Sequence, residues 1–329
     1  MGISFLLSDK KGTGKTAMAG AMLMLLRDEG KRGAYYKPFS DSPENDCDVA
    51  FISRVFDDLD IPAPNPILEG SINQIGQLME SHLSRLSDAN DHVVIEMPDS
   101  ETMSGAVRVA SGLSSLSAKG LFILKYHTGV DQTFLSYVCK PFDNPLKGIV
   151  FNQVTTHRIG ELSRELIPTI NSSEFKVLGA IPETRAMLTV TLRQIAAQLN
   201  GAWLEEPVDP DSSISHFLVG GNIMDSGPNY FGRYSDQAVI VRAERPDIQM
   251  ASLGGDTKCL ILTGGGEPSE YIRVEASKHN VPLFLSSTDT ESTVNGLSHL
   301  FSDSYRLDYP KMESFKQLVA QHLDLDSLF

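Results

Sequence analysis

The chain is poor in cysteine and tryptophan, and its basic residues are outnumbered by acidic ones. Its 329 residues include three cysteines and one tryptophan, and 28 lysines and arginines stand against 42 aspartates and glutamates. Because Cys47, Cys139 and Cys259 are far apart and form no metal-type or redox-type pair, we interpret them as reduced thiols of a cytoplasmic protein. The net charge of −14 argues against a nucleic-acid partner, since phosphate backbones require clustered lysine and arginine.

Signals for a membrane and for several kinds of catalysis are also missing. The apolar stretch from Ala17 to Leu26 reaches only about half of the roughly 20 residues that a bilayer requires. The Met1-Gly2 start lacks the serine or threonine of a myristoylation signal, because Leu6 occupies that position. The eight histidines form no close ligand pair, and no Gly-x-Ser-x-Gly elbow occurs, so metal-dependent hydrolysis and acyl-enzyme chemistry have little support. We expect a soluble protein with no membrane partner.

A phosphate-binding pattern is present near the N-terminus. The segment Ser8-Asp9-Lys10-Lys11-Gly12-Thr13-Gly14-Lys15-Thr16 follows a strand-like run and precedes a helical one, which is the setting of a nucleotide-binding P-loop. Backbone N–H groups of such a turn converge on phosphate oxygens at a helix N-terminus. Lys15 would reach the terminal phosphates, and the Thr16 hydroxyl would bind the magnesium that bridges them. Asp9 stands where the usual pattern has glycine.

This loop predicts ATP and Mg²⁺ as cofactors. Its glycines permit the tight turn, and its lysine and threonine supply the charge and the metal ligand. The residues expected to bind the nucleotide are Gly12, Thr13, Gly14, Lys15 and Thr16.

Short apolar runs recur along the first part of the chain, each followed by a polar loop and a helix-period segment. Several runs are continuous rather than alternating, as strands buried on both faces are. The sequence therefore predicts an α/β fold of the P-loop NTPase type, with a mostly parallel, doubly wound sheet. The expected strands are Ile3–Leu7, Ala34–Tyr36, Val93–Ile95, Leu121–Leu124, Gly148–Phe151 and Val177–Ile181.

The composition changes after residue 204, where the segment 205–213 is too acidic and proline-rich to continue a packed element. We therefore expect a nucleotide-binding domain over residues 1–204, a linker over 205–213, and a second, smaller α/β domain over 214–329. The tail of that second domain has apolar residues at helical spacing, which predicts a C-terminal helix. The other elements expected there are the strands Ala238–Val241, Cys259–Leu262 and Leu283–Leu285 and the helices Asp247–Leu253, Ser269–His279 and Glu291–Leu300.

Polar residues directly after the expected strands are site candidates, because ligands of parallel sheets bind at the carboxyl ends of the strands. Lys37 could neutralise a phosphate or a carboxylate substrate, or be a solvated surface lysine. Of Asp46 and Asp48, one could cap a helix while the other assists a metal. Glu96 ends a buried run, where P-loop proteins often place an acidic residue that holds magnesium or its water. The amide of Asn152 could pair with a purine edge or form a turn.

With these residues laid out, positions 1 to about 204 resemble the dethiobiotin synthetase and cobyrinic acid a,c-diamide synthase group of P-loop proteins. The segments that carry the resemblance are Ser8–Thr16, Tyr36–Pro38, Val94–Glu96, Val150–Asn152 and Leu178–Glu183. The roles that it implies are phosphate and magnesium binding for Lys15 and Thr16, catalysis at the reacting carboxylate or carbamate for Lys37, metal binding for Asp48 and Glu96, and adenine binding for Asn152. The family commonly has glycines after the acidic residue, whereas this chain has Met97-Pro98-Asp99, so its substrate-facing loop departs from the pattern.

From about residue 212 onward the chain resembles a small domain named DRTGG. The segments Phe217–Gly220, Arg245–Gln249 and Cys259–Gly265 carry this resemblance, with Glu244 at the acidic position. Together the two halves are similar, in the same order, to the N-terminal, non-catalytic part of long phosphate acetyltransferases, which implies that acetyl transfer is not an activity of this chain. The glycine segment 264–266 could bind an anion through backbone N–H groups or form a plain turn.

Three functions fit these patterns. The one we favour is a regulatory or sensory module, in which the first domain binds ATP and the second forms a homo-oligomer or reads an unknown small molecule. The second is an ATP-dependent ligase, in which Lys15, magnesium and Lys37 stabilise phosphoryl transfer to a carboxylate or carbamate that then meets an amine or ammonia. The third is a partition-type ATPase, suggested by Lys10 and disfavoured by the acidic composition. Whether the protein is an enzyme stays open; as an enzyme it would be a ligase or a weak ATPase.

Overall fold

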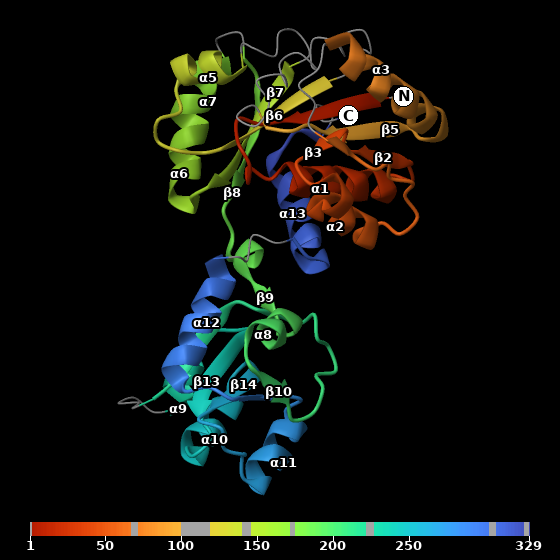
Figure 1. The fold of residues 1–329 in the computed structure, drawn as a ribbon. Coiled ribbons are helices and arrows are strands. Elements are labelled where there is room, and N and C mark those ends of the chain that lie inside the picture. The colour runs from red at the N-terminus through yellow and green to blue at the C-terminus, as the bar shows by residue number, and fades with distance from the viewer. Residues whose placement is uncertain are drawn as a thin grey trace. The chain divides into compact units, whose positions relative to one another are not determined.

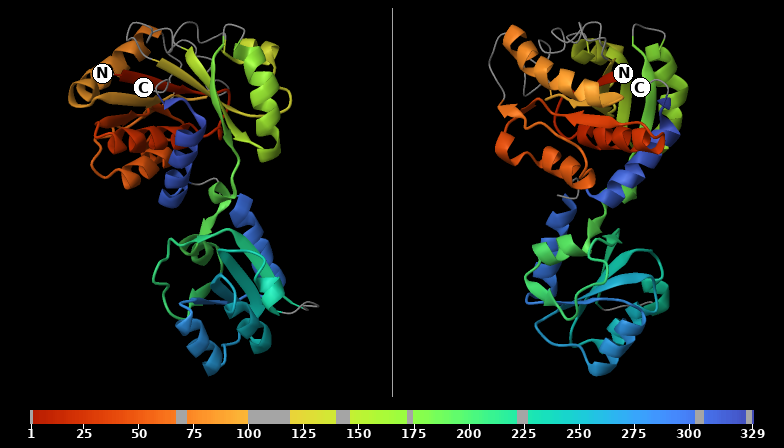
Figure 2. Two further views of the ribbon diagram at one scale, coloured as in Figure 1. Left: turned by 180° about the vertical axis from the view of Figure 1, so that it is seen from behind. Right: turned by 90° about the vertical axis from the view of Figure 1, so that its right-hand side faces the viewer.

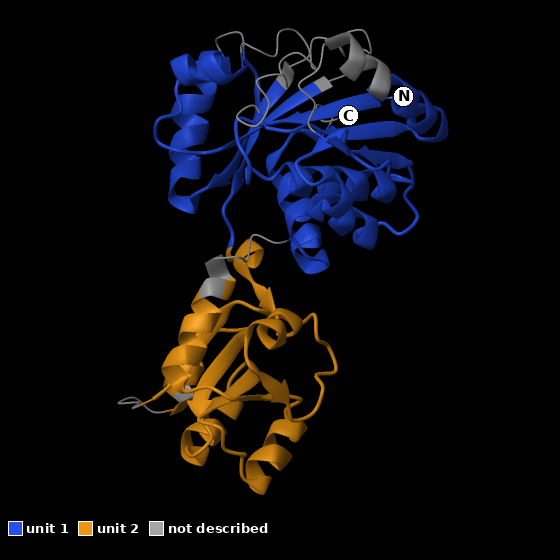
Figure 3. Cartoon of the chain, viewed as in Figure 1, with its two compact units in different colours: residues 1–184, 307–329 blue, residues 185–306 orange. Residues whose placement is uncertain are grey.

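Two compact units make up the computed structural model. Unit 1 comprises residues 1–184 and 307–329, and unit 2 comprises residues 185–306 (Figures 1 and 3). Each unit has its own sheet and its own hydrophobic core. The structure describes residues 2–66, 72–99, 119–139, 146–171, 175–221, 227–302, 307–325 and 329.

The sheet of unit 1 contains six parallel strands in the order β2-β5-β1-β6-β7-β8. Every strand expected here from an apolar run is confirmed, because these runs are buried between helices; Val93, Val94 and Ile95 are fully buried. The strand order reverses at β1, which places the loop after β1 at the centre of the sheet's carboxyl edge. The strands are β1 (Gly2–Leu7), β2 (Gly33–Tyr36), β5 (His92–Glu96), β6 (Lys119–Lys125), β7 (Leu146–Val154) and β8 (Val177–Pro182).

Helices cover both faces of this sheet (Figure 1). Successive side chains of a strand point to opposite faces, so Tyr36 packs with Phe5 and with helices α3 and α5 in one core, while its neighbour Tyr35 points to the other face. Within the described ranges no helix has the length and apolarity to cross a bilayer. The helices of unit 1 are α1 (Lys15–Asp28), α2 (Cys47–Val55), α3 (Ile72–Ala89), α5 (Gln132–Cys139), α6 (Thr156–Glu161), α7 (Ile167–Asn171) and α13 (Tyr309–His322), and a short strand pair is formed by β3 (Phe39–Ser40) and β4 (Asn65–Pro66).

The C-terminal helix α13 lies in unit 1, whereas the sequence predicts it in the second domain. It packs along α1 (Figure 2). The two helices approach closely at Gly20, where a Cβ atom would lie 2.3 Å from Cε of Met312. Phe315 and Val319 of α13 are buried. The helix itself is therefore confirmed, but apolar spacing along a helix does not identify the surface against which the helix packs.

Unit 2 is a smaller α/β unit with a five-stranded sheet in the order β10-β15-β14-β13-β12. Strands β12 to β15 are parallel, and β10 pairs antiparallel at one edge. One core includes residues of α8 and α12, and the other includes residues of α9, α10 and α11. The elements are β9 (Val190–Thr191), α8 (Leu192–Gln198), β10 (Gly201–Trp203), β11 (Ser213–Ile214), β12 (His216–Gly220), α9 (Gly227–Phe231), β13 (Gln237–Arg242), α10 (Pro246–Leu253), β14 (Thr257–Thr263), α11 (Glu270–Lys278), β15 (Leu283–Ser286) and α12 (Thr290–Ser302).

The division between the units falls after residue 184, not in the linker expected over 205–213. Strand β10 pairs with β15, and β11 pairs with β9, so the chain on both sides of that segment is part of unit 2. Within the segment, Asp211 accepts from Nε of Arg193 at 2.9 Å. An acidic, proline-rich stretch can thus be a loop that is tied to its own domain, because its carboxylates find cationic partners there.

Candidate functional site

The loop between β1 and α1 (residues 8–14, the cradle) turns tightly at two glycines. Gly12 and Gly14 have φ of 75° and 100°, in the left-handed region that favours glycine. A Cβ atom on Gly14 would also lie 2.4 Å from Nδ2 of Asn152. Glycine at position 14 is therefore required both for its φ and for the close approach of Asn152. The loop leads directly into the N-terminus of α1, where the helix dipole favours an anion.

The polar residues Ser8, Asp9 and Thr13 of this loop are buried, and so is Lys15 at the start of α1. Nζ of Lys15 donates to Oγ of Ser8 at 2.6 Å, and burial lowers the pKa of Lys15 below its ordinary value. The Thr13 residue is 1% exposed, and its hydroxyl has no hydrogen-bond partner among the residues that the structure describes. A buried hydroxyl without a partner is costly. An anion in the cradle would accept from this hydroxyl and from the Lys15 ammonium, so these residues fit a bound phosphate.

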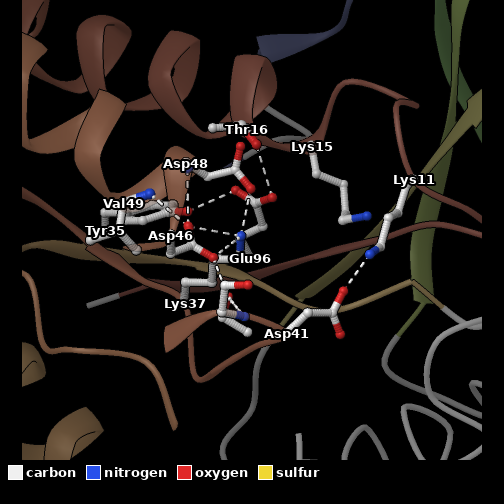
Figure 4. Close-up of polar contacts among 12 residues, drawn as sticks. Lys11, Lys15, Thr16, Tyr35, Lys37, Asp41, Asp46, Asp48, Val49 and Glu96 are labelled. Atoms are coloured by element: carbon white, nitrogen blue, oxygen red, sulfur yellow. Dashed lines mark hydrogen bonds and ion pairs between the residues drawn. The ribbon is translucent and has the colours of Figure 1, made fainter. Parts of the chain in front are cut away.

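Glu96, the last residue of β5, lies beside the loop (Figure 4). Its Oε1 accepts from the hydroxyl of Thr16 at 2.9 Å, and its Oε2 accepts from the hydroxyl of Tyr35 at 2.8 Å. Burial and the charge of Asp48 raise the pKa of Glu96, against the opposing effect of two nearby lysines. A carboxylate that is 3% exposed depends on such donors, because it has lost its water.

Lys37 follows β2 and lies among carboxylates (Figure 4). Its Nζ is 2.8 Å from Oδ2 of Asp46 and 2.5 Å from Oδ2 of Asp48. Burial by itself lowers the pKa of Lys37, but the charges of Glu96 and Asp48 outweigh this effect and raise the pKa above its ordinary value. Lys37 is therefore a fixed cation of the site and not a solvated surface lysine.

Of the two aspartates Asp46 and Asp48, Asp46 is the one that caps helix α2. Its Oδ1 accepts from the backbone N–H groups of Asp48 and Val49 at 3.0 and 2.9 Å, in the first turn of α2. Its Oδ2 accepts from the hydroxyl of Ser40 at 2.5 Å. Burial tends to raise the pKa of Asp46, but the hydrogen bonds from Lys37 and Ser40 lower it below its ordinary value. Asp48, which caps nothing, is left as the candidate metal ligand of the pair.

The oxygen donors of the site fit a magnesium ion that arrives with a nucleotide. Thr16 and Glu96 are hydrogen-bonded, and Asp48 is close enough to raise the pKa of Glu96. Over the described ranges no group of three or more histidine, cysteine, aspartate and glutamate residues could hold an ion alone. Mg²⁺ is usually bound by one or two carboxylates together with phosphates and waters. The three residues would thus contribute part of its coordination and leave the rest to phosphate and water.

Asn152 lies at the cradle, but its amide is bonded to the backbone at both ends. Nδ2 donates to the carbonyl oxygen of Thr13 at 2.8 Å, and Oδ1 accepts from the N–H of Gln153 at 2.9 Å. Gln153 has a φ of 55°, and its Nε2 donates to the carbonyl oxygen of Gly12 at 3.2 Å. The two residues support the loop, a role that the sequence does not indicate. Adenine binding by Asn152 stays a prediction.

Three further residues contact the predicted site residues, although the sequence patterns assign no role to them. Tyr35, Ser8 and Ser40 each donate to or accept from a predicted site residue, and none was a candidate in the sequence. For Tyr35 a signal does exist, because alternation along β2 puts it on the sheet face opposite the core that contains Tyr36. For the two serines, only the folded loops bring the hydroxyls to their partners.

In unit 2 the glycine segment 264–266 follows β14 as a turn. Gly264 and Gly265 have φ of 90° and 72°, and the N–H of Gly264 donates to the carbonyl oxygen of Thr288 at 3.1 Å. The guanidinium of Arg245 pairs with Asp247 through two hydrogen bonds of 3.0 and 2.8 Å. The turn alone explains why glycine stands at positions 264 and 265. Anion binding by the segment 264–266 stays a prediction.

Comparison with known proteins agrees with this division of the chain. The family model of the DRTGG domain matches residues 194–300. The expected resemblance of the second half is therefore confirmed, and the match begins before the boundary that the composition predicts. Unit 1, with its parallel sheet and its glycine-rich loop between a central strand and a helix, has a P-loop NTPase fold. Unit 2 contains a DRTGG domain.

Several solved structures are similar to parts of the chain. The regulatory region of Clostridium perfringens pyrophosphatase, with CBS and DRTGG domains and the activator diadenosine tetraphosphate, is 21% identical, with 37% of this chain and 50% of that chain covered and a TM-score of 0.28. The MinD cell division protein of Aquifex aeolicus is 13% identical, with 57% and 84% covered and a TM-score of 0.41. Cell division protein FtsY of Thermotoga maritima is 14% identical, with 55% and 62% covered and a TM-score of 0.40. The chain thus spans half the length of the pyrophosphatase regulatory region.

Proposed function

We propose that the protein is an ATP-binding regulatory module that does not itself transfer acetyl groups. The observation that carries this proposal is the cradle after β1, where Lys15 and Thr13 are buried beside the Thr16–Glu96 pair and the Thr13 hydroxyl has no hydrogen-bond partner among the described residues. A DRTGG domain on the same chain supports a regulatory role. In this function unit 1 binds ATP with magnesium, and unit 2 reads a small-molecule effector or joins a second copy of the chain.

The residues of the cradle have separate tasks in this function. The backbone N–H groups around Gly12 and Gly14 and the Lys15 ammonium neutralise the phosphates. Thr16, Asp48 and Glu96 would hold the magnesium, which when bound would withdraw charge from the phosphate oxygens. Asn152 supports the loop through its hydrogen bond to the carbonyl oxygen of Thr13. Because the loop is already formed, little conformational entropy has to be lost on binding.

Titration calorimetry with ATP and Mg²⁺ tests the proposal. The wild-type protein should bind, and Lys15→Met should lose about 10- to 100-fold in affinity, the value of one or two hydrogen bonds to a charged group. Lys31→Met is a matched control, because Lys31 follows α1, lies outside the cradle and has a side chain that is 51% exposed; it should bind as the wild type does. Absence of binding by the wild type would remove the basis of the proposal.

A second candidate function is an ATP-dependent ligase, and the position of Lys37 favours it. Its ammonium is fixed by Asp46 and Asp48 and stays charged, as a group that stabilises a phosphorylated carboxylate or carbamate must be. ADP release from ATP in mixtures of carboxylic acids with amines or ammonia would support the ligase. In that case Lys37→Met should lose the release and keep ATP binding. Negligible release that no added acid stimulates would leave the regulatory module as the function.

The oligomeric state is a further part of the proposal. We expect a homo-oligomer formed through unit 2, in the cytoplasm and with neither a membrane nor a nucleic acid as partner. Sedimentation of the whole chain, with and without ATP and magnesium, tests this directly. A monomer at all concentrations in both conditions would contradict it.

A further inference from the structure

The hydroxyl of Tyr35 is a buried polar group outside the P-loop motif. Tyr35 is fully buried in β2, and its hydroxyl donates to Oε2 of Glu96 at 2.8 Å. The other oxygen of the same carboxylate accepts from Thr16 at 2.9 Å. Each oxygen of Glu96 thus has one neutral donor, Tyr35 on the strand side and Thr16 on the cradle side (Figure 4).

Glu96 has two stronger partners within electrostatic range. The charges of Lys37 and Lys15 both act on its carboxylate. A hydrogen bond between two charged groups is stronger than one from a neutral hydroxyl. A carboxylate without the Tyr35 bond would therefore turn toward a lysine, which would withdraw Glu96 from Thr16. The Tyr35 bond opposes this change.

We propose that Tyr35 is a positioning residue that holds Glu96 against Thr16 for the magnesium of a bound nucleotide. The inference rests on the proposed function, because it assigns a role in the same site. Partners that orient a metal-binding carboxylate contribute to metal affinity although they do not touch the metal. A phenol that only filled space in this core would gain nothing from its hydroxyl, whose burial is costly unless it is hydrogen-bonded.

The neighbouring residue provides a matched control. Tyr36 is also fully buried in β2, but it lies in the core on the other face of the sheet. Its hydroxyl lies 3.3 Å from Nδ1 of His82. Tyr35→Phe and Tyr36→Phe each remove one buried hydroxyl and keep the ring, and Tyr35→Phe alone removes a donor to Glu96.

The experiment measures ATP affinity by calorimetry as a function of Mg²⁺ concentration and, separately, in EDTA. Tyr35→Phe should reduce the gain in affinity that Mg²⁺ gives by about 10-fold, at the lower end of the effect of such supporting residues. In EDTA it should bind ATP as the wild type does, and Tyr36→Phe should match the wild type in both conditions. In a Glu96→Gln background, Tyr35→Phe should cause no further loss.

The outcomes separate this inference from the function on which it rests. Wild-type protein that fails to bind ATP with Mg²⁺ would overturn both. Binding by the wild type with the same Mg²⁺ dependence in Tyr35→Phe would overturn the role of Tyr35 alone. So would an equal loss of affinity in EDTA and in Mg²⁺, or a full Tyr35→Phe effect in the Glu96→Gln background, because a general structural defect would give either result.

Discussion

Asp46 contacts both Lys37 and the N-terminus of α2. Substitutions of Asp46 should therefore separate the contribution of the ion pair to stability from the contribution of the helix cap. The side chain is 6% exposed. One oxygen accepts from two backbone N–H groups at the start of α2, and the carboxylate as a whole pairs with Lys37. Asp46→Ala removes both functions. Asp46→Asn keeps an oxygen for the helix cap, since asparagine caps as well as aspartate does, and removes the charge.

The free energies of unfolding of the two variants should differ by the contribution of the helix cap. Loss of an N-cap costs about 1 kcal/mol, and loss of hydrogen bonds to a charged group costs about 2 kcal/mol. Lys37 keeps Asp48 as a partner, so the cost of an isolated buried ammonium does not arise. Asp46→Ala should therefore lower the free energy of unfolding of unit 1 by about 3 kcal/mol, and Asp46→Asn by about 2 kcal/mol.

Urea unfolding followed by circular dichroism measures both values. With a slope of about 2 kcal/mol per molar urea, the midpoint should fall by about 1.5 M for the alanine variant and by about 1 M for the asparagine variant. Fluorescence of the single tryptophan, Trp203 in β10, reports on unit 2 and should keep its wild-type midpoint. Equal midpoints for the two variants would refute the capping role, and a midpoint of Asp46→Asn at the wild-type value would refute the contribution of the ion pair.

The same variants predict a pH dependence with a definite sign. The pKa of Asp46 is lower in the folded protein than its ordinary value of 3.8. The ion pair therefore stabilises the fold in full above that value, and the contribution is lost as the pH falls through the lower pKa of the folded state. The difference in stability between wild type and Asp46→Asn should be constant near neutral pH and shrink in acid. A difference that grows in acid would contradict the sign.

Two further predictions concern glycines that lie against side chains. Gly14→Ala should abolish ATP binding in calorimetry and leave the far-ultraviolet circular dichroism unchanged, because its Cβ would lie 2.4 Å from Nδ2 of Asn152 at a φ of 100°; wild-type affinity would contradict the cradle geometry. Gly20→Ala should lower the midpoint of thermal unfolding, because its Cβ would lie 2.3 Å from Met312. The loss should be smaller when Gly20→Ala is introduced into a Met312→Ala background, so a double-mutant cycle checks it, and strict additivity would show that α13 does not pack there.

The sequence predicts the parallel sheet of unit 1 well because its signal is local. A strand that is buried on both faces needs a continuous apolar run, and a run such as Val93–Ile95 is visible without any knowledge of its neighbours. Strands such as β9 and β11 have two residues each, and no periodicity can be read from two residues. The pairing of these two strands lies inside unit 2, and composition does not reveal it.

Part of the site can likewise be predicted from local sequence, and the rest depends on contacts between residues that are far apart in the chain. Apolar runs in the sequence lead directly into the P-loop, Lys37 and Glu96, so these site residues can be predicted without knowledge of the fold. The contact of Tyr35 with Glu96 joins residues 61 positions apart, and the packing of α13 on α1 joins the two ends of the chain. Both depend on strand and helix neighbours that only the folded topology determines. Whether Asp46 or Asp48 caps α2 depends on the residue at which the helix begins, and the sequence does not determine that residue.

In the proposed function, the balance of charge in the site would make magnesium part of nucleotide recognition. Lys15 and Lys37 lie among the carboxylates of Asp46, Asp48, Glu96 and Asp99, and Lys37 is already paired with Asp46 and Asp48. A free ATP molecule would bring its own negative charge to a group that has no excess of positive charge. A divalent cation reverses this balance, because carboxylates that repel the phosphates become ligands of the ion that binds them. In the proposed function the acidic residues would therefore favour the magnesium complex over free ATP, and the orientation of Glu96 by Tyr35 would determine the size of that preference.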